Sequence, residues 1–133
     1  MSRAFLDANV LFSAAYRENA GLLALWRLPE TDLLASGYAI EEARRNLESS
    51  QARARLDELL TGVQTVVECA DLHLPHSVRL AEKDRPILAA AIAAGATHLI
   101  TGDLKDFLPL LGRRVAGVLV QTPADFLKSR QRK

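Results

Sequence analysis

The chain has 133 residues, of which 49% are hydrophobic and 25% are charged, and its formal net charge is +1. These values predict one folded domain with a substantial core and exclude a disordered or strongly basic chain. No run approaches the ~18 consecutive apolar residues that cross a membrane, no signal peptide is visible, and a single cysteine cannot form an internal disulfide. We therefore expect a soluble, cytoplasmic protein with no membrane partner.

Short apolar runs alternate with helical patterns along the chain. The predicted strands are Arg3 to Leu6, Thr31 to Ala35, Val63 to Cys69, His98 to Thr101 and Val115 to Val120. Predicted helices cover 10–16, 22–26, 40–47, 52–60, 86–94 and 124–130, with a loop at 73–76 and a short helical piece at 78–81. Strands joined by helical crossovers form a parallel sheet covered on both faces. The predicted fold is a three-layer α/β/α sandwich around a central parallel sheet of about five strands, with one domain at 1–127 and a basic tail at 128–133.

Acidic residues stand at the ends of several predicted elements. Asp7 follows the first strand, and Asp103 follows the fourth strand after Gly102. Asp84 begins the Ala-rich helix that leads into the fourth strand, and Glu41 and Glu42 fall in the first turn of the helix after the second strand. Because the carboxyl ends of parallel strands share one edge of a sheet, the sequence places at least four carboxylates there.

Each of these acids alone has a structural explanation, as a helix cap or a turn residue. A shared position is harder to explain in that way, because like charges ~4 Å apart repel by about 4 kcal/mol at an effective dielectric constant of 20. Such a group needs raised pKa values or a bound cation. Oxygen ligands without nearby His or Cys suit Mg²⁺ or Mn²⁺, and Mg²⁺ commonly meets phosphate groups as well. The pattern therefore points to phosphate chemistry.

Four motifs carry a family resemblance: FLDANVLFSA, GYAIEEARRNL, KDRPILAAAIAAGATHLITGD and VQTPADFL, in this order. Together they resemble the PIN-domain ribonucleases, which include the VapC-like toxins of toxin–antitoxin pairs. The resemblance covers Arg3 to Leu127. It implies a metal-dependent endoribonuclease that hydrolyses single-stranded RNA to 5′-phosphate and 3′-hydroxyl products, with an antitoxin protein and a second copy of the chain as partners.

The resemblance also assigns roles to individual residues. It implies that the first and fourth strands are neighbours, which would bring the acids that follow them together. Among the two glutamates, spacing alone puts Glu42 opposite the apolar stripe of its helix, and the choice of Glu42 over Glu41 rests on the resemblance. Asp106 resembles a variable fourth aspartate of the family, and the Leu104-Lys105 spacer leaves the direction of its side chain open. The implied catalytic and metal-binding residues are Asp7, Glu42, Asp84 and Asp103, with Asn9, Thr101 and Asp106 in support.

Basic and aromatic residues give weaker indications. The candidates for RNA contact are arginines 44, 45, 53, 55, 113 and 114 and the tail at 128–133, although a solvated charge is the more common explanation for each. Seven aromatic residues (four Phe, two Tyr and one Trp) are too few for an extended base-stacking platform. Tyr16 and Trp26 lie in the first two predicted helices, where family members often dimerise, although Trp26 is equally suited to core packing.

Two other functions fit parts of the same pattern. A catalytically silent PIN-like module that binds RNA or protein would be marked by a missing acid, whereas all four positions are filled here. A phospho-accepting receiver domain needs an acceptor aspartate at the end of the third strand, but the chain reaches Asp71 only after an offset. It also needs paired acids after the first strand, where Asp7 stands alone.

Overall fold

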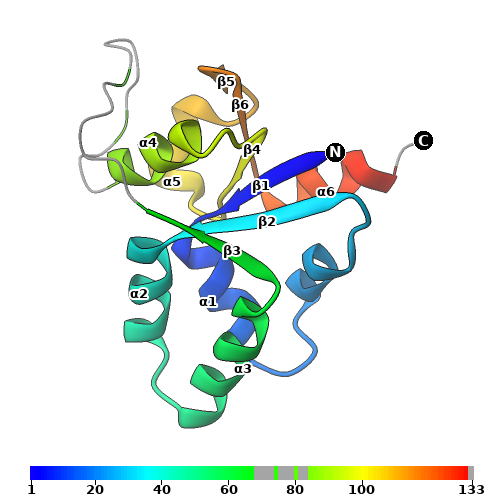
Figure 1. Ribbon diagram of the computed structural model, residues 1–133, viewed down its shortest axis with the longest axis vertical. Coiled ribbons are helices and arrows are strands. Elements are labelled where there is room, and N and C mark those ends of the chain that lie inside the picture. Colours follow the sequence, from blue (N-terminus) through cyan, green and yellow to red (C-terminus); the bar gives the residue numbers. More distant parts are fainter. Residues whose placement is uncertain (68–73, 75–79, 81–83, 132–133) are drawn as a thin grey trace.

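The computed structural model describes residues 1–67, 74, 80 and 84–131 (Figure 1). Six strands form one sheet in the order β3-β2-β1-β4-β6-β5. Every neighbouring pair is parallel except β5 and β6, which are antiparallel. The strands are β1 (Ser2–Leu6), β2 (Thr31–Ser36), β3 (Val63–Val66), β4 (His98–Ile100), β5 (Arg114–Val115) and β6 (Val118–Gln121).

Helices connect the strands and cover both faces of the sheet (Figure 1). The predicted α/β/α class is therefore confirmed. No helix in the described part of the chain is long and apolar enough to cross a membrane. The helices are α1 (Ala8–Tyr16), α2 (Gly37–Asn46), α3 (Ser50–Leu60), α4 (Arg85–Ala93), α5 (Leu104–Phe107) and α6 (Pro123–Gln131), with 3-10 helices η1 (Gly21–Arg27) and η3 (Leu108–Leu110).

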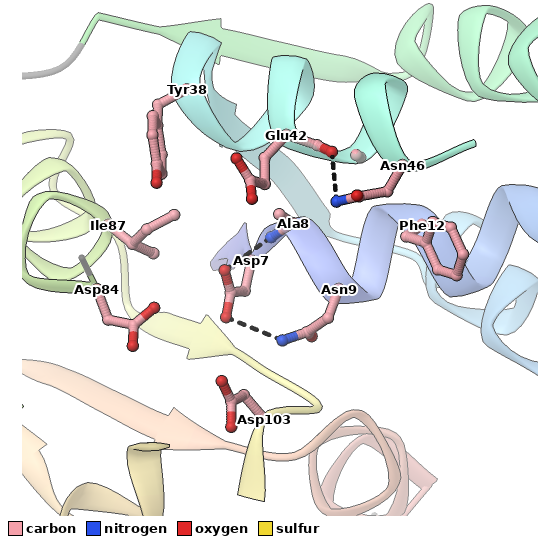
Figure 2. A pocket seen from close by; sticks show the side chains of 11 residues that line it. Asp7, Ala8, Asn9, Phe12, Tyr38, Glu42, Asn46, Asp84, Ile87 and Asp103 are labelled. Carbon is pink, nitrogen blue, oxygen red and sulfur yellow. Dashed lines mark hydrogen bonds between the residues drawn. The ribbon is translucent and has the colours of Figure 1, made fainter. Parts of the chain in front are cut away.

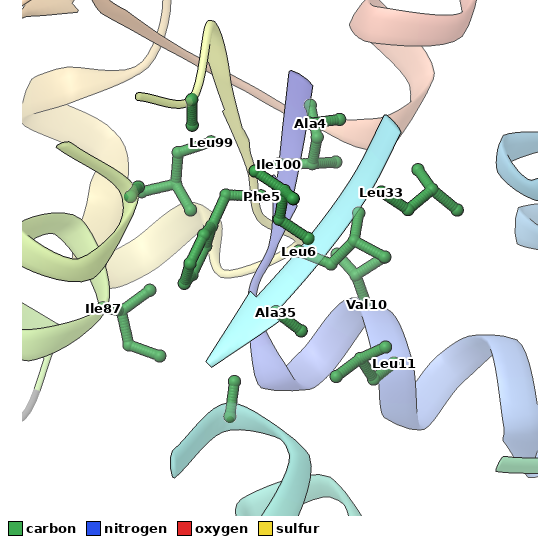
Figure 3. Packing of buried hydrophobic residues seen from close by; sticks show 14 of the residues in the cluster. Ala4, Phe5, Leu6, Val10, Leu11, Leu33, Ala35, Ile87, Leu99 and Ile100 are labelled. Atoms are coloured by element: carbon green, nitrogen blue, oxygen red, sulfur yellow. The ribbon is translucent and has the colours of Figure 1, made fainter. Parts of the chain in front are cut away.

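Alternation along the central strands supplies the core on both faces of the sheet. Phe5 of β1 lies towards Ile87 of α4, whereas the next residue, Leu6, lies on the other side near Val10 of α1 (Figure 3). All four side chains are at most 2% exposed. The sheet is thus packed between two helical layers, which is the arrangement expected when a parallel sheet is buried on both faces.

Two predicted elements differ in the structure. The strand predicted at 115–120 is a hairpin of β5 and β6, because Ala116 (φ 49°) and Gly117 (φ 87°) form a tight turn with two left-handed residues. The second predicted helix is the 3-10 helix η1. The third predicted strand ends at Val66; residues 68–69, 73, 75–76, 78–79 and 81 of the predicted strand end, loop and helical piece lie outside the described residues.

The neighbouring strands β1 and β4 position the acidic residues. Phe5 pairs with Leu99 and Leu6 with Ile100, and the Asp7 amide continues the ladder by donating to the Ile100 carbonyl at 3.0 Å. The adjacency of the first and fourth predicted strands is therefore confirmed. It brings Asp7, which follows β1, next to the turn that follows β4.

Candidate active site

An open pocket of about 430 Å³ lies at the carboxyl ends of β1 and β4. Figure 2 shows four carboxylates pointing into it from four separate parts of the chain. The sequence-predicted acids are thus brought together in space. The lining consists of Asp7, Glu42, Asp84 and Asp103 with the amides Asn9 and Asn46 and the apolar or aromatic residues Ala8, Phe12, Tyr38, Ala43 and Ile87.

Asp7 is held by hydrogen bonds to both of its carboxylate oxygens. It is the N-cap of α1, and its Oδ1 accepts from the Ala8 amide at 2.7 Å. Its Oδ2 accepts from Thr101 Oγ1 at 2.8 Å and from Asn9 Nδ2 at 3.2 Å. Asp7 is only 5% exposed. Asp7 therefore caps α1 and lines the acidic pocket at the same time.

Thr101 and Asn9 tie Asp7 to the loop that follows β4. The fully buried Thr101 hydroxyl donates to Asp7 and accepts from the Asp103 amide at 3.0 Å. Asn9 donates to Asp7 while its Oδ1 accepts from the Gly102 amide at 2.8 Å. A Cβ at Gly102 would lie 3.2 Å from Asn9 Oδ1, so glycine lets the two segments approach this closely. The predicted supporting residues Asn9 and Thr101 thus lie in direct contact with Asp7.

Asp84 and Asp103, which line the pocket, form a tighter group with Asp106, which is not part of the lining. Asp84 and Asp103 each offer one oxygen that lies within 4.8 Å of the other and of an oxygen of Asp106. Asp103 is the N-cap of α5, and its Oδ1 accepts from the Asp106 amide at 2.9 Å. Asp84 sits at the N-cap position of α4, with no capping hydrogen bond from its side chain, and is 8% exposed. The short helix α5 therefore turns Asp106 towards the other two acids.

Glu42 lies on the opposite wall of the pocket from Asp103 (Figure 2). It projects from α2 into the pocket, where its carboxylate accepts from Arg45 one helical turn later. Glu41, its neighbour in sequence, is exposed and is not part of the lining. Glu42 contributes one carboxylate from a fourth segment, and its charge is partly balanced by Arg45.

Burial and like charge set the protonation of Asp7. Desolvation raises its pKa above the ordinary value of 3.8, and the charges of Asp84 and Asp103 raise it further. Hydrogen bonds from Thr101 and the Ala8 amide act in the opposite direction without reversing the shift. Asp7 is thus held in a place where its negative charge is unfavourable unless a cation is close.

The donors in the pocket fit a hard divalent cation. The described side chains that line it offer carboxylate and amide oxygens and include neither His nor Cys. An oxygen-only set of this kind is the ligand chemistry of Mg²⁺ and Mn²⁺. Asp84, Asp103 and Asp106 are spaced closely enough to share one ion, and in the described residues neither Asp7 nor Glu42 belongs to that closest group.

The sequence prediction missed two polar residues, Tyr38 and Asn46, that line the pocket from α2. Tyr38, Glu42 and Asn46 are four residues apart, which places them on one face of the helix. The Asn46 side chain donates to the Glu42 carbonyl at 3.0 Å and also lines the pocket. Counting four residues in each direction from Glu42 would have found both.

Most of the arginines considered for RNA contact have partners within the protein. Arg44 pairs with Asp57 at 2.6 Å, Arg45 pairs with Glu42, and Arg53 donates to the Leu47 carbonyl at 2.7 Å. Arg55 reaches the carbonyl oxygens of residues 15 and 16 at 2.9 and 2.8 Å. These four arginines thus have contacts within the protein, while Arg113 and the β5 residue Arg114 are exposed.

The fold and the pocket together define an α/β protein with an acidic site at the carboxyl ends of its parallel strands. The sequence model of the PIN domain family matches residues 3–105. The chain therefore belongs to the PIN domain family, a family of nucleases, and the resemblance stated above is confirmed.

Solved structures show the same fold. The crystal structure of VapBC2 from Rickettsia felis bound to a DNA fragment from their promoter is similar to this chain, with a TM-score of 0.62 and 16% identity over 90% of this chain and 98% of that chain. No curated protein is significantly similar to the chain.

Proposed function

We propose that this protein is a metal-dependent endoribonuclease that hydrolyses phosphodiester bonds of single-stranded RNA. The observation that carries the proposal is the meeting of Asp7, Glu42, Asp84 and Asp103 in one open pocket, although they come from distant parts of the chain. Membership of the PIN domain family supports the same activity.

The tight aspartate group is the best place for a Mg²⁺ or Mn²⁺ ion. Asp84, Asp103 and Asp106 would hold it, with Asp7 on the deeper side of the pocket. A bound ion of this kind would lower the pKa of a coordinated water and offset the charge that develops on the phosphoryl oxygens.

The protein's own residues supply orientation and proton transfer. Thr101 and Asn9 fix the Asp7 carboxylate by donating to its Oδ2, so one orientation is maintained as the substrate binds. Glu42 faces the aspartates across the pocket and is suited to accept a proton from the attacking water or to orient that water. The carboxylates also exclude a substrate phosphate that carries no cation, because like charges repel.

The partners proposed for the chain follow from its relatives. The similar VapBC2 structure contains a toxin–antitoxin complex, and we infer by analogy that this chain acts as a toxin with its own antitoxin. A homodimer is proposed through the α1 surface, where Tyr16 is 63% exposed beside Phe12. An RNA substrate and a single cysteine both fit a cytoplasmic location.

The test is cleavage of a labelled single-stranded RNA by the purified chain with Mn²⁺, with EDTA, and after Asp7→Asn. Asparagine can still accept from the Ala8 amide, so the variant should fold while losing the charge. We expect cleavage only with the wild-type chain and metal. Full activity of the variant would contradict the assignment of Asp7, and RNA binding without any cleavage by the wild type would favour the silent-module alternative.

A further inference from the structure

The acidic pocket has an apolar and aromatic end that the proposed reaction does not use. Tyr38 and Ile87 lie together at this end, next to Asp84, as Figure 2 shows. Tyr38 projects from the first turn of α2 and is 41% exposed, whereas Ile87 of α4 is 2% exposed. One wall therefore presents a ring to solvent, and the other supplies a fixed apolar surface beneath it.

The size of the pocket bears on what else it can hold. The pocket measures about 430 Å³, which lies in the range of sites that hold small organic molecules, so a further group can bind beside the acids. Because Asp7, Glu42, Asp84 and Asp103 already make the site strongly negative, an anionic group is disfavoured where it meets the protein, and a neutral ring meets this condition.

We propose that Tyr38 is a specificity-determining residue that stacks on the nucleobase next to the scissile phosphate. A nucleobase is flat, neutral and attached one sugar away from the phosphate, and an exposed aromatic ring is its usual protein partner. A base can reach Tyr38 only when its face is free, which happens in single strands and not inside a helix. This inference rests on the proposed ribonuclease function and adds a reason for single-strand preference.

Position on α2 links the stacking residue to the catalytic group. Tyr38 precedes Glu42 by four residues, so both side chains lie on the same face of one helix. Ser36 fixes the start of that helix, since its hydroxyl accepts from the Ala39 amide at 3.1 Å. A base stacked on Tyr38 would therefore set where the adjoining phosphate lies relative to Glu42 and the aspartates.

The experiment compares three proteins on two substrates: the wild type, Tyr38→Leu and Tyr38→Phe, each with Mn²⁺. The first substrate is a single-stranded oligoribonucleotide whose cleaved bond has been mapped, and the second carries an abasic ribose next to that bond. Removal of one stacking contact should lower kcat/KM by roughly 5- to 150-fold. We expect this loss for Tyr38→Leu on the intact RNA, mainly through KM, and a smaller loss for Tyr38→Phe, which keeps the ring.

The abasic substrate separates stacking from a purely structural role. The wild type should lose activity on it, whereas Tyr38→Leu should cleave both substrates at nearly the same reduced rate, because the contact is already absent. If the abasic ribose lowers the activity of Tyr38→Leu by the same factor as that of the wild type, the proposal is overturned. An unchanged rate of this variant on intact RNA would also overturn it. The second result would leave Tyr38 available as a contact for a partner protein. If the wild type cleaves neither RNA, the proposed function itself fails, and this inference fails with it.

Discussion

At the amino-terminal side of the sheet Arg3 lies 3.6 Å from Asp32 and donates to the Ala94 carbonyl at 3.0 Å, so opposite charges of neighbouring strands meet. At the carboxyl side, three aspartates come within 4.8 Å of one another, and a fourth, Asp7, is buried beside them. The same sheet thus pairs charges at one end and collects like charges at the other.

This difference separates charges that serve the fold from charges that serve a site. The pair of Arg3 and Asp32 is partly exposed, and pairs of this kind contribute little to stability. At the other end burial, together with the smaller effect of the charges of Asp84 and Asp103, raises the pKa of Asp7, and its ionised carboxylate therefore costs stability in the absence of a cation. A protein maintains such an arrangement at a site where it has a function.

Asp103→Asn should have the largest effect on the acidic end. Asparagine is a good N-cap, so α5 should persist while the site loses one charge of its closest group. Charge stabilisation by a bound metal is worth several kcal/mol, and we expect cleavage with Mn²⁺ to fall roughly a hundredfold or more. Rates on single-stranded RNA and circular dichroism measure the two properties. Near wild-type cleavage by a folded variant would remove Asp103 from the site.

Metal binding should stabilise the fold through the same aspartates. At Mn²⁺ concentrations about ten times the dissociation constant, linkage predicts a gain of roughly 1.4 kcal/mol, or about 5 °C in Tm. Asp106→Asn should reduce this shift, because it removes one carboxylate of the closest group. Thermal melts with and without Mn²⁺ give the comparison. An unchanged shift in the variant would show that Asp106 does not bind the ion.

The protonation of Asp7 predicts how stability without metal depends on pH. Its pKa is raised in the folded chain, so its contribution to stability is full below the ordinary value of 3.8 and is lost as the pH rises through the folded pKa. Asp7→Asn removes this loss. Between about pH 4 and pH 8, the free energy of unfolding of the variant should therefore rise relative to wild type. Urea titrations in EDTA measure it, and a relative fall would contradict the sign.

Asp32→Asn should have the smallest effect and serves as the matched control from the other end of the sheet. The side chain of Asp32 is 45% exposed and pairs with Arg3, so the variant should lose at most about 1 kcal/mol of stability. Cleavage of RNA and the Mn²⁺ shift in Tm should be unchanged. A loss of activity as large as that of Asp103→Asn would remove the distinction between the two ends.

The sequence was sufficient to predict the acids whose positions depend on strand order. Asp7 and Asp103 follow the neighbouring strands β1 and β4, so a parallel sheet is sufficient to bring them to one edge. The direction of Asp106 was beyond prediction, because it depends on a four-residue helix capped by Asp103. Tyr38 was not predicted although it lies one helical turn before Glu42, because an uncharged residue carries no sign of an acidic site.

Other features depend on contacts that no local pattern contains. Arg55 donates to the carbonyl oxygens at the end of α1, about forty residues away in sequence, which no local pattern predicts. The hairpin of β5 and β6 turns at Ala116 and Gly117, a pair that lacks the usual Asn-Gly signal. The apolar run at 115–120 therefore resembled one continuous strand.

The central claim is that carboxylates from distant segments bind one divalent cation at the carboxyl ends of β1 and β4. Anomalous diffraction from crystals soaked in MnCl₂ tests it most directly, because the signal locates manganese without reference to activity. We predict a peak in the pocket, in direct coordination with Asp103 and with at least one of Asp84, Asp106 and Asp7. Saturating Mn²⁺ with no peak among these side chains, or a peak only elsewhere on the molecule, would contradict the account.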